Sequence, residues 1–387
     1  MLVNPGGLIG PDEVVGRDAL IGRIWRRLER QSVILTSERR TGKTSILHKM
    51  QKEVAPGFVV LTEDPDIEGL HSPLEFVERV YRDAERHLHP SQRRSGFRRA
   101  FAKLAGFELA GVIKFPGSLA PQWKALLEAL LDDLSSVPGE RLVFFWDEMP
   151  VFINNVRLRA GDNEAAEILD ALRAVRQRHG RLRMVFTGSI GFHTVTGALT
   201  AAGVNSPLLN DMWLQDVPPL APEDGALLAA ELLEGEGARA SDRQAVAQAI
   251  TAAAGHVPFY IHHIVDALVE HGGVIEESSV PAVVARRLHD DSDPWLMSHY
   301  LTRTSHYPPH RKEVALALLD ILAREDSAGF ERVFSLLQAH LPAHDEELVR
   351  GVVMLLKRDH YVTQSEDGSY AFRSALLRQW WRHERTS

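Results

Sequence analysis

Residues 37–44 are Ser-Glu-Arg-Arg-Thr-Gly-Lys-Thr, one residue away from the phosphate-binding pattern G-x-x-x-x-G-K-[ST], because Ser37 replaces the first glycine. The segment follows the β-branched run 32–36, which is typical of a buried strand, and precedes a helical run at 44–54. A strand, a turn and a helix in this order direct backbone N–H groups and the positive end of a helix toward an anion. The alternative is a chance Gly-Lys-Thr in a loop, but the flanking strand and helix favour a phosphate site.

The residue types within this segment suit a nucleoside triphosphate. Gly42 allows close approach of the backbone, Lys43 reaches the β- and γ-phosphates, and the Thr44 hydroxyl ligates Mg²⁺. Serine disfavours positive φ, so Ser37 leaves the detailed turn of the loop open. We expect ATP and Mg²⁺ as cofactors, with the phosphates held by Arg40, Thr41, Gly42, Lys43, Thr44 and Ser45.

Two carboxylates, Asp147 and Glu148, directly follow the apolar run 142–146. A carboxylate at the end of a strand beside the phosphate loop can hold Mg²⁺, and a following glutamate can polarise the attacking water. We therefore assign Asp147 and Thr44 to the metal, and Glu148 and Lys43 to catalysis. An acidic helix cap is the alternative.

The next apolar strand, 183–186, leads into Thr187-Gly188-Ser189. A polar side chain there can lie between the acidic strand and the phosphate loop and sense the γ-phosphate. We expect Ser189 or Thr187 in this role and carry Ser189 forward as a catalytic candidate. A simple turn at the end of the strand is the alternative.

Strand-like and helix-like runs alternate up to residue 218, which predicts an α/β fold with a parallel sheet and helices on both faces. Residues 222–290 are rich in Ala and Leu, with helical periodicity and no strand signal. The last 75 or so residues combine helices with a hairpin, a pattern that suggests a winged helix. We expect three domains: an ATPase core (1–218), a helical lid (219–292) and a winged helix (305–387).

Composition narrows the class of protein. The 387 residues include no cysteine, which excludes disulfides, thiolate zinc sites and iron–sulfur clusters. A net charge of −8 is unlike that of a bulk nucleic-acid binder, although it allows a local basic patch. The apolar runs are far shorter than the roughly 20 residues that span a bilayer, and the first ten residues lack signal-peptide features. We expect a cytoplasmic protein with no membrane association.

Six segments carry a family resemblance: 15–18, 39–45, 207–211, 219–223, 255–258 and 370–381. They resemble the predicted archaeal-type ATPases, a family of AAA+-related P-loop NTPases that lies near the STAND signalling NTPases. The resemblance implies an ASCE-type ATPase core, a helical lid and a C-terminal winged helix. It also implies that the nucleotide state controls domain arrangement, assembly or partner binding.

Ring-forming AAA+ motors place an arginine between the fourth and fifth strands and another in the lid. Residues 188–238 and 244–285 contain neither lysine nor arginine. A missing arginine finger predicts slow hydrolysis, which suits a regulatory switch or assembly factor better than a motor. The remaining candidate fingers, for which we favour a solvated helix or loop face, are Arg157, Arg159, Arg173 and Arg176.

The stretch from Arg93 to Lys103 carries five basic residues with Phe97 and Phe101 interleaved. It is either a nucleic-acid contact or an amphipathic helix with its apolar face docked, and we favour the docked helix. We expect a protein partner, and the sequence is compatible with assembly into an oligomer when nucleotide is bound. The alternatives are a DNA-associated ATPase of the replication or transposition loader type, which would use the winged helix, and a nucleotide-binding scaffold without turnover.

Overall fold

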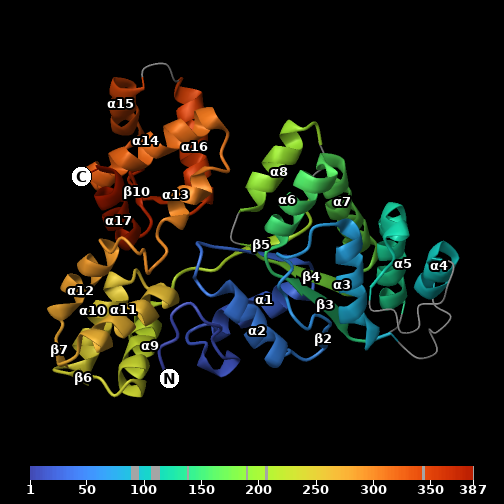
Figure 1. The fold of residues 1–387 in the computed structure, drawn as a ribbon, viewed down its shortest axis with the longest axis horizontal. Coiled ribbons are helices and arrows are strands. Elements are labelled where there is room, and N and C mark those ends of the chain that lie inside the picture. Colours follow the sequence, from blue (N-terminus) through green and yellow to red (C-terminus); the bar gives the residue numbers. More distant parts are fainter. Residues whose placement is uncertain are drawn as a thin grey trace. The chain divides into compact units, whose positions relative to one another are not determined.

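The computed structural model describes residues 1–88, 96–105, 114–136, 139–188, 191–204, 208–341 and 345–386. The chain divides into two compact units (Figure 1). The first, here called the sheet unit, consists of Asp18–Thr36 and Lys43–Val217. The second, the helical unit, consists of Met1–Arg17, Ser37–Gly42 and Pro218–Ser387. Within the described ranges, we find no helix with the length and apolar content that crossing a membrane requires.

The sheet unit contains a five-stranded sheet in which every pair of neighbours is parallel. This confirms the predicted α/β fold with a parallel sheet. In a parallel sheet all strands point the same way, so the residues that follow β1, β3 and β4 emerge at one edge. The strand order is β2 (Phe58–Val60), β3 (Arg141–Trp146), β4 (Leu182–Phe186), β1 (Val33–Thr36) and β5 (Trp213–Asp216).

Alternate residues of the central strands pack on opposite faces of this sheet, as the period of a strand requires. Val143 and Phe145 belong to the core that faces α1 (Asp18–Leu28) and α2 (Lys43–Lys52). Phe144 and Trp146 belong to the core on the other face. The helices on that face are α3 (Pro73–Glu85), α4 (Gly96–Ala105), α5 (Trp123–Ser135), α6 (Met149–Ala160), α7 (Asp162–Arg178) and α8 (Phe192–Ala201).

Two helices of the sheet unit, α6 and α8, were not predicted. The sequence at the start of α6 resembles a turn because it contains Pro150, but proline is tolerated in the first helical turn. The sequence of α8 contains threonines and a glycine, which are poor helix formers. In both helices, burial against the sheet outweighs local propensity.

The helical unit contains one large hydrophobic core that extends from Leu220 to Trp381. The expectation that 222–290 has no strand is wrong: β6 (Arg239–Ala240) and β7 (Val274–Ile275) form a short parallel ladder. Two-residue strands are too short to produce a visible alternation of apolar residues. The helices are α9 (Pro222–Gly235), α10 (Arg243–Ala253), α11 (Pro258–His271), α12 (Ser279–Leu288), α13 (His299–Thr304), α14 (Pro309–Glu325), α15 (Phe330–His340), α16 (Glu346–Arg358) and α17 (Ala375–Thr386).

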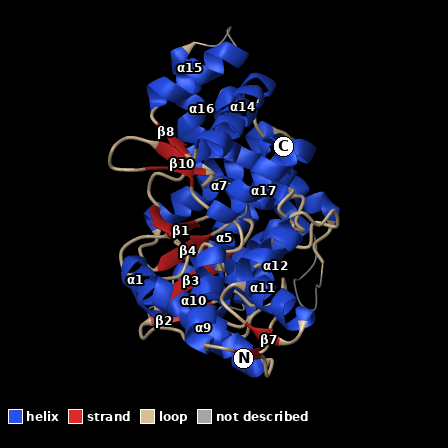
Figure 2. Cartoon of the chain, turned by 90° about the vertical axis from the view of Figure 1, so that its left-hand side faces the viewer, coloured by secondary structure: helices blue, strands red, loops and turns tan. Residues whose placement is uncertain are grey.

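A second small sheet lies near the C-terminus of the helical unit (Figure 2). Its order is β8 (Ser327–Ala328), β10 (Tyr370–Phe372) and β9 (Val362–Gln364), and both pairings are antiparallel. The β9–β10 hairpin follows α16 directly, where the sequence predicts a hairpin after helices.

A buried ion pair joins α7 to the segment before β5. The guanidinium of Arg176 donates two hydrogen bonds of 2.8 Å to Asp211, and its side chain is 3 % exposed. Replacing Asp211 by alanine leaves this charge buried without its partner. We expect Asp211→Ala to lower the free energy of unfolding by about 3 kcal/mol, seen as a lower urea midpoint. The matched variant Glu167→Ala breaks an exposed pair on the same helix and should cost less than about 1 kcal/mol.

Candidate phosphate and metal site

The loop between β1 and α2 has the turned backbone that an anion site needs. Arg40 has φ of 72° and Gly42 has φ of 92°, whereas Ser37, Arg39 and Thr41 are not among the residues with positive φ. A left-handed residue between right-handed or extended ones produces a concave turn of N–H groups, which binds anions. The loop is followed at once by α2, whose first residue is Lys43.

Ser37, the residue that departs from the glycine pattern, fits this loop without backbone strain. Its hydroxyl donates to the carbonyl of Glu38 at 2.8 Å and lies 2.6 Å from the Thr41 hydroxyl. Thr41 in turn donates to the same Glu38 carbonyl at 3.1 Å. The serine therefore contributes side-chain hydrogen bonds that glycine would lack, and the left-handed conformations fall on Arg40 and Gly42 instead.

The carboxylate of Asp147 accepts hydrogen bonds from several segments of the sheet unit. It is 4 % exposed. Thr44 donates to Oδ2 at 2.5 Å, Thr187 donates to Oδ1, and the backbone N–H of Glu148 donates to Oδ1 at 3.0 Å. These bonds bring together residues from α2, from the end of β3 and from the end of β4. The metal residues expected from the sequence, Thr44 and Asp147, are therefore in direct contact.

This donor set suits Mg²⁺. A threonine hydroxyl and a carboxylate are hard oxygen ligands, and Mg²⁺ is commonly held by one or two carboxylates together with substrate phosphates and water. Within the described ranges, no group of three or more His, Cys, Asp or Glu residues is arranged to hold a metal ion. Thr44 and Asp147 can thus hold a magnesium ion that arrives with a nucleotide, and they do not form a self-sufficient metal cage.

Glu148 adopts a left-handed conformation, with φ of 57° and ψ of 29°, at the position before α6. This conformation costs a residue with a Cβ roughly 1–2 kcal/mol. The backbone on either side is fixed: Asp147 N donates to Pro65 O at 2.7 Å, and Met149 N donates to Thr187 O at 3.1 Å. Strain held in place by the surrounding structure is common at functional sites. The half-buried Glu148 side chain follows directly after the buried Asp147 carboxylate.

The other predicted residues occupy the following places. Lys43 is buried, with 7 % exposure, at the start of α2, and Ser45 is half-buried in the first turn of that helix. Ser189 lies outside the described residues. Thr187, the alternative considered for the same role, is fully buried and donates to Asp147.

Arg17 contacts the phosphate loop, although sequence reasoning gave it no role. Its guanidinium donates to the carbonyls of Thr41 at 2.9 Å and Pro218 at 2.8 Å. Burial lowers the pKa of Arg17 to about 10, which leaves it charged at neutral pH. The available signal was its place in the segment 15–18, which resembles the archaeal-type ATPases.

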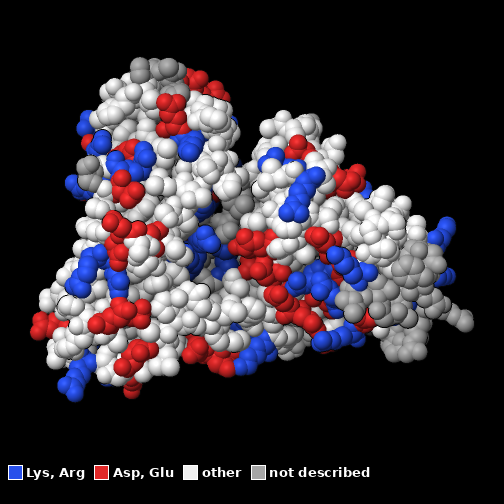
Figure 3. All heavy atoms as spheres, viewed as in Figure 1, with Lys and Arg blue, Asp and Glu red and all other residues white. Residues whose placement is uncertain are grey.

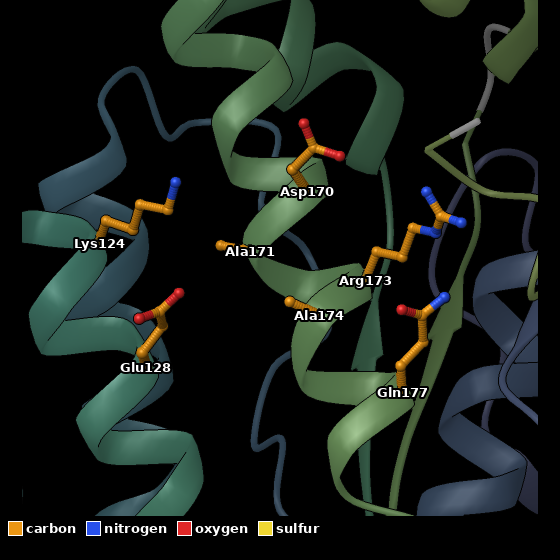
Figure 4. A pocket seen from close by; sticks show the side chains of 7 residues that line it. All are labelled: Lys124, Glu128, Asp170, Ala171, Arg173, Ala174 and Gln177. Atoms are coloured by element: carbon orange, nitrogen blue, oxygen red, sulfur yellow. The ribbon is translucent and has the colours of Figure 1, made fainter. Parts of the chain in front are cut away.

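Three of the candidate arginine fingers have contacts or neighbours of their own. Arg176 is buried and donates to Asp211, so the expected solvated face is wrong for this residue. Arg157 donates to Asn154 at 3.1 Å and 3.2 Å. Arg173 lines a groove of about 330 Å³ between α5 and α7, together with Lys124, Glu128, Asp170 and Gln177 (Figure 4). This groove shares no lining residue with the phosphate site.

A strand, a turned loop, a helix that begins with lysine and threonine, and an acid at the end of the neighbouring strand define the P-loop NTPase fold. Solved structures share it over the whole chain. A Walker-type ATPase of Pyrococcus abyssi matches with a TM-score of 0.64 at 13 % identity, over 99 % of this chain and 100 % of that one. The ORC2 protein of Aeropyrum pernix, in ADPNP–ADP complexes, matches with a TM-score of 0.54 at 12 % identity, over 98 % and 97 %.

No protein-family model matches the chain, and no curated protein matches it either. At 12–13 % identity these structural likenesses establish the fold. The predicted P-loop architecture is confirmed, and it is the fold of archaeal Walker-type and ORC proteins, as the sequence resemblance implies.

Position 42 needs glycine because of its backbone conformation, with φ of +92°. Steric space is not the reason, because a Cβ built on Gly42 meets no atom within 4 Å. We expect Gly42→Ala to destabilise the protein by about 1–2 kcal/mol in thermal or urea unfolding. Gly22 in α1 is the control, since its Cβ also has open space and its φ is not positive. Gly22→Ala should be neutral or stabilising by up to about 1 kcal/mol. Equal effects of the two substitutions would contradict the assigned role of the loop conformation.

Proposed function

We propose that this protein binds ATP with Mg²⁺ at Lys43, Thr44 and Asp147 and hydrolyses it slowly. The observation that carries the proposal is the 2.5 Å hydrogen bond from Thr44 to the buried carboxylate of Asp147. It brings the first turn of α2 to the acidic end of β3, the place where a P-loop fold holds the metal of its nucleotide. The structural neighbours add support: one is described as an ATPase, and the other is in complex with ADPNP and ADP.

Each residue then has a defined task. Lys43 and the N–H groups of Arg40 to Ser45 bind the phosphates, while Thr44 and Asp147 hold Mg²⁺, which neutralises phosphate charge when it is bound. Thr187 and the Glu148 N–H orient the Asp147 carboxylate through Oδ1. Glu148 accepts hydrogen bonds from the attacking water and positions it. Ser189 remains a proposed γ-phosphate sensor beside Thr187.

Slow turnover follows from the arginine distribution. Residues 188–238 and 244–285 carry no lysine or arginine, and Arg176 is held by Asp211. An arginine finger contributes roughly 10³–10⁵ in rate. An ATPase that supplies none from these segments hydrolyses slowly, and its nucleotide state lasts long enough to act as a regulatory switch or to control an assembly.

We propose an ATPase core at 1–218, a helical lid at 219–292 and a winged helix at 305–387. The β9–β10 hairpin directly after α16 supports the winged helix. The candidate recognition helix of this winged helix is α16, and it carries few basic side chains that are available to bind DNA. Arg350 pairs with Glu346 at 2.6 Å and stacks on Phe330, and Lys357 donates to Gln364 at 2.7 Å.

These contacts favour a protein partner over DNA. On the face drawn in Figure 3, basic and acidic side chains are interspersed. The basic helix α4 has Phe97 and Phe101 fully buried, which supports the docked amphipathic helix, while Arg93 and Arg94 lie outside the described residues. Turnover measured with and without duplex DNA separates the two: stimulation by DNA would select the loader-type alternative.

Lys43 should be essential for binding. We expect Lys43→Ala to abolish tight ATP binding in calorimetry, because Lys43 is the lysine of the phosphate-binding motif, whose charge reaches the β- and γ-phosphates. The control is Lys52→Ala, at the exposed end of the same helix, which should keep the wild-type affinity. Equal ATP affinity of wild type and Lys43→Ala would refute the site.

Glu148 should be essential for hydrolysis and not for binding. We expect Glu148→Gln to bind ATP like wild type and to lose phosphate release by about 10²-fold or more, because glutamine cannot act as a base toward water. Glu68→Gln serves as the matched acidic control on a nearby exposed loop and should leave turnover unchanged. Undiminished turnover in Glu148→Gln would remove Glu148 from the mechanism, and binding without turnover in the wild type would indicate a scaffold.

A further inference from the structure

Two side chains of the phosphate loop, Glu38 and Arg40, contact residues more than 200 positions away along the chain. Arg40 donates to the backbone carbonyl of Trp295, and its guanidinium lies 3.9 Å above the ring of Phe259. The hydroxyl of Tyr300 donates to the Glu38 carboxylate. All of these residues belong to the helical unit. The interior of the loop is therefore anchored by a backbone carbonyl and by side chains that are not part of the nucleotide-binding motif.

The residues that receive the loop form a preorganised segment, 293–300. The Asp293 carboxylate accepts from the N–H of Met297 at 2.6 Å and from that of Ser298 at 2.9 Å. Asp293 and Leu296 both have left-handed backbones, with φ of 46° and 51°. A segment fixed in this way presents the Trp295 carbonyl and the Tyr300 hydroxyl at defined places.

The anchors act on a residue whose backbone needs support. Arg40 has φ of 72°, a conformation that is unfavourable for a residue with a Cβ, and it is one of the two residues that turn the loop. Such conformations persist when the surroundings determine them. The Arg40 guanidinium contacts the Trp295 carbonyl and the ring of Phe259, and these contacts help to fix the residue.

The anchor at Tyr300 continues toward the C-terminal end of the chain. Tyr361 donates to the Tyr300 carbonyl at 2.7 Å, and the two rings lie 5.7 Å apart. Tyr361 also packs against Trp381 of α17 and directly precedes β9. Burial, and then the Glu38 carboxylate, raise the pKa of Tyr300 well above its ordinary value, so its hydroxyl stays a donor.

We propose that the Trp295 carbonyl and Tyr300 are positioning groups that keep the phosphate loop in the conformation that binds a nucleotide. Through the same contacts, nucleotide binding at the loop alters the C-terminal helices. This inference rests on the proposed ATP binding at Lys43. It assigns Glu38 and Arg40 to the coupling between nucleotide and partner-binding regions. Arg40 thus acts through its backbone, and its guanidinium does not bind phosphate.

Two substitutions of Arg40 test the assignment. Arg40→Ala removes the anchor and keeps the unfavourable φ, so the affinity for ADPNP should fall by about tenfold in calorimetry. Arg40→Gly also removes the anchor, but glycine takes positive φ without cost and should recover most of the lost affinity. A guanidinium that binds phosphate directly would instead make both variants equally weak, and this result would overturn the inference.

A double-mutant cycle tests the second anchor. Glu38→Gln and Tyr300→Phe should each weaken ADPNP binding by about tenfold, and the double variant should be no weaker than either one. Tyr307→Phe, which removes a hydrogen bond to Asp359 in the same unit, is the control for stability alone and should keep the affinity. Additive effects of the first two variants would overturn the coupling.

Trp295 offers a spectroscopic readout. Trp295→Phe retains the backbone carbonyl and should bind ADPNP like wild type. We expect ADPNP to change the tryptophan fluorescence of the wild type and this change to be lost in Trp295→Phe. The proposed function and this inference fail in different ways. Absence of ADPNP binding by the wild type would remove the function, whereas binding that needs Lys43 but is unchanged in Arg40→Ala and Tyr300→Phe would remove only the inference.

Discussion

The site depends on the hydrogen bonds that the buried carboxylate of Asp147 accepts. Taking an ionised carboxylate out of water is costly unless hydrogen bonds replace its hydration. Here the hydroxyls of Thr44 and Thr187 and the N–H of Glu148 supply them. These donors come from three chain segments that only a parallel sheet brings to one edge. The parallel sheet thus places all three donors around the Asp147 carboxylate.

The strand register explains why the donors meet. β3 pairs with β4 so that Trp146 lies opposite Phe186, and the next residues, Asp147 and Thr187, leave the sheet side by side. The Thr187 N–H donates to the Trp146 carbonyl at 3.0 Å, which continues the ladder into the site. A shift of one residue would exchange Phe144 and Trp146 with Val143 and Phe145 between the two cores and disrupt the packing of both. The packing of the two cores therefore fixes the positions of Asp147 and Thr187 at the edge of the sheet.

The parts of the fold and site that repeat a local pattern could be predicted from the sequence. The strands of the sheet, the loop before Lys43 and the acid after β3 are each defined by neighbours within a few residues. The α6 and α8 helices and the β6–β7 ladder could not, because tertiary burial stabilises them against weak local signals. The roles of Arg17 and Tyr300 were hidden for a related reason: they contact the loop from 24 and 262 positions away along the chain.

The phosphate loop combines two kinds of constraint. The chain leaves the sheet unit at Thr36 and returns to it at Lys43, and the six residues between them belong to the helical unit. The ends of the motif are fixed by a strand and a helix, while its interior is fixed by Arg17, Trp295 and Tyr300. A ligand that prefers one conformation of the interior must alter the energy of those contacts, because any differential binding shifts the equilibrium between conformations. A slow hydrolytic step would keep that shift in place, which is the property that distinguishes a switch from a motor.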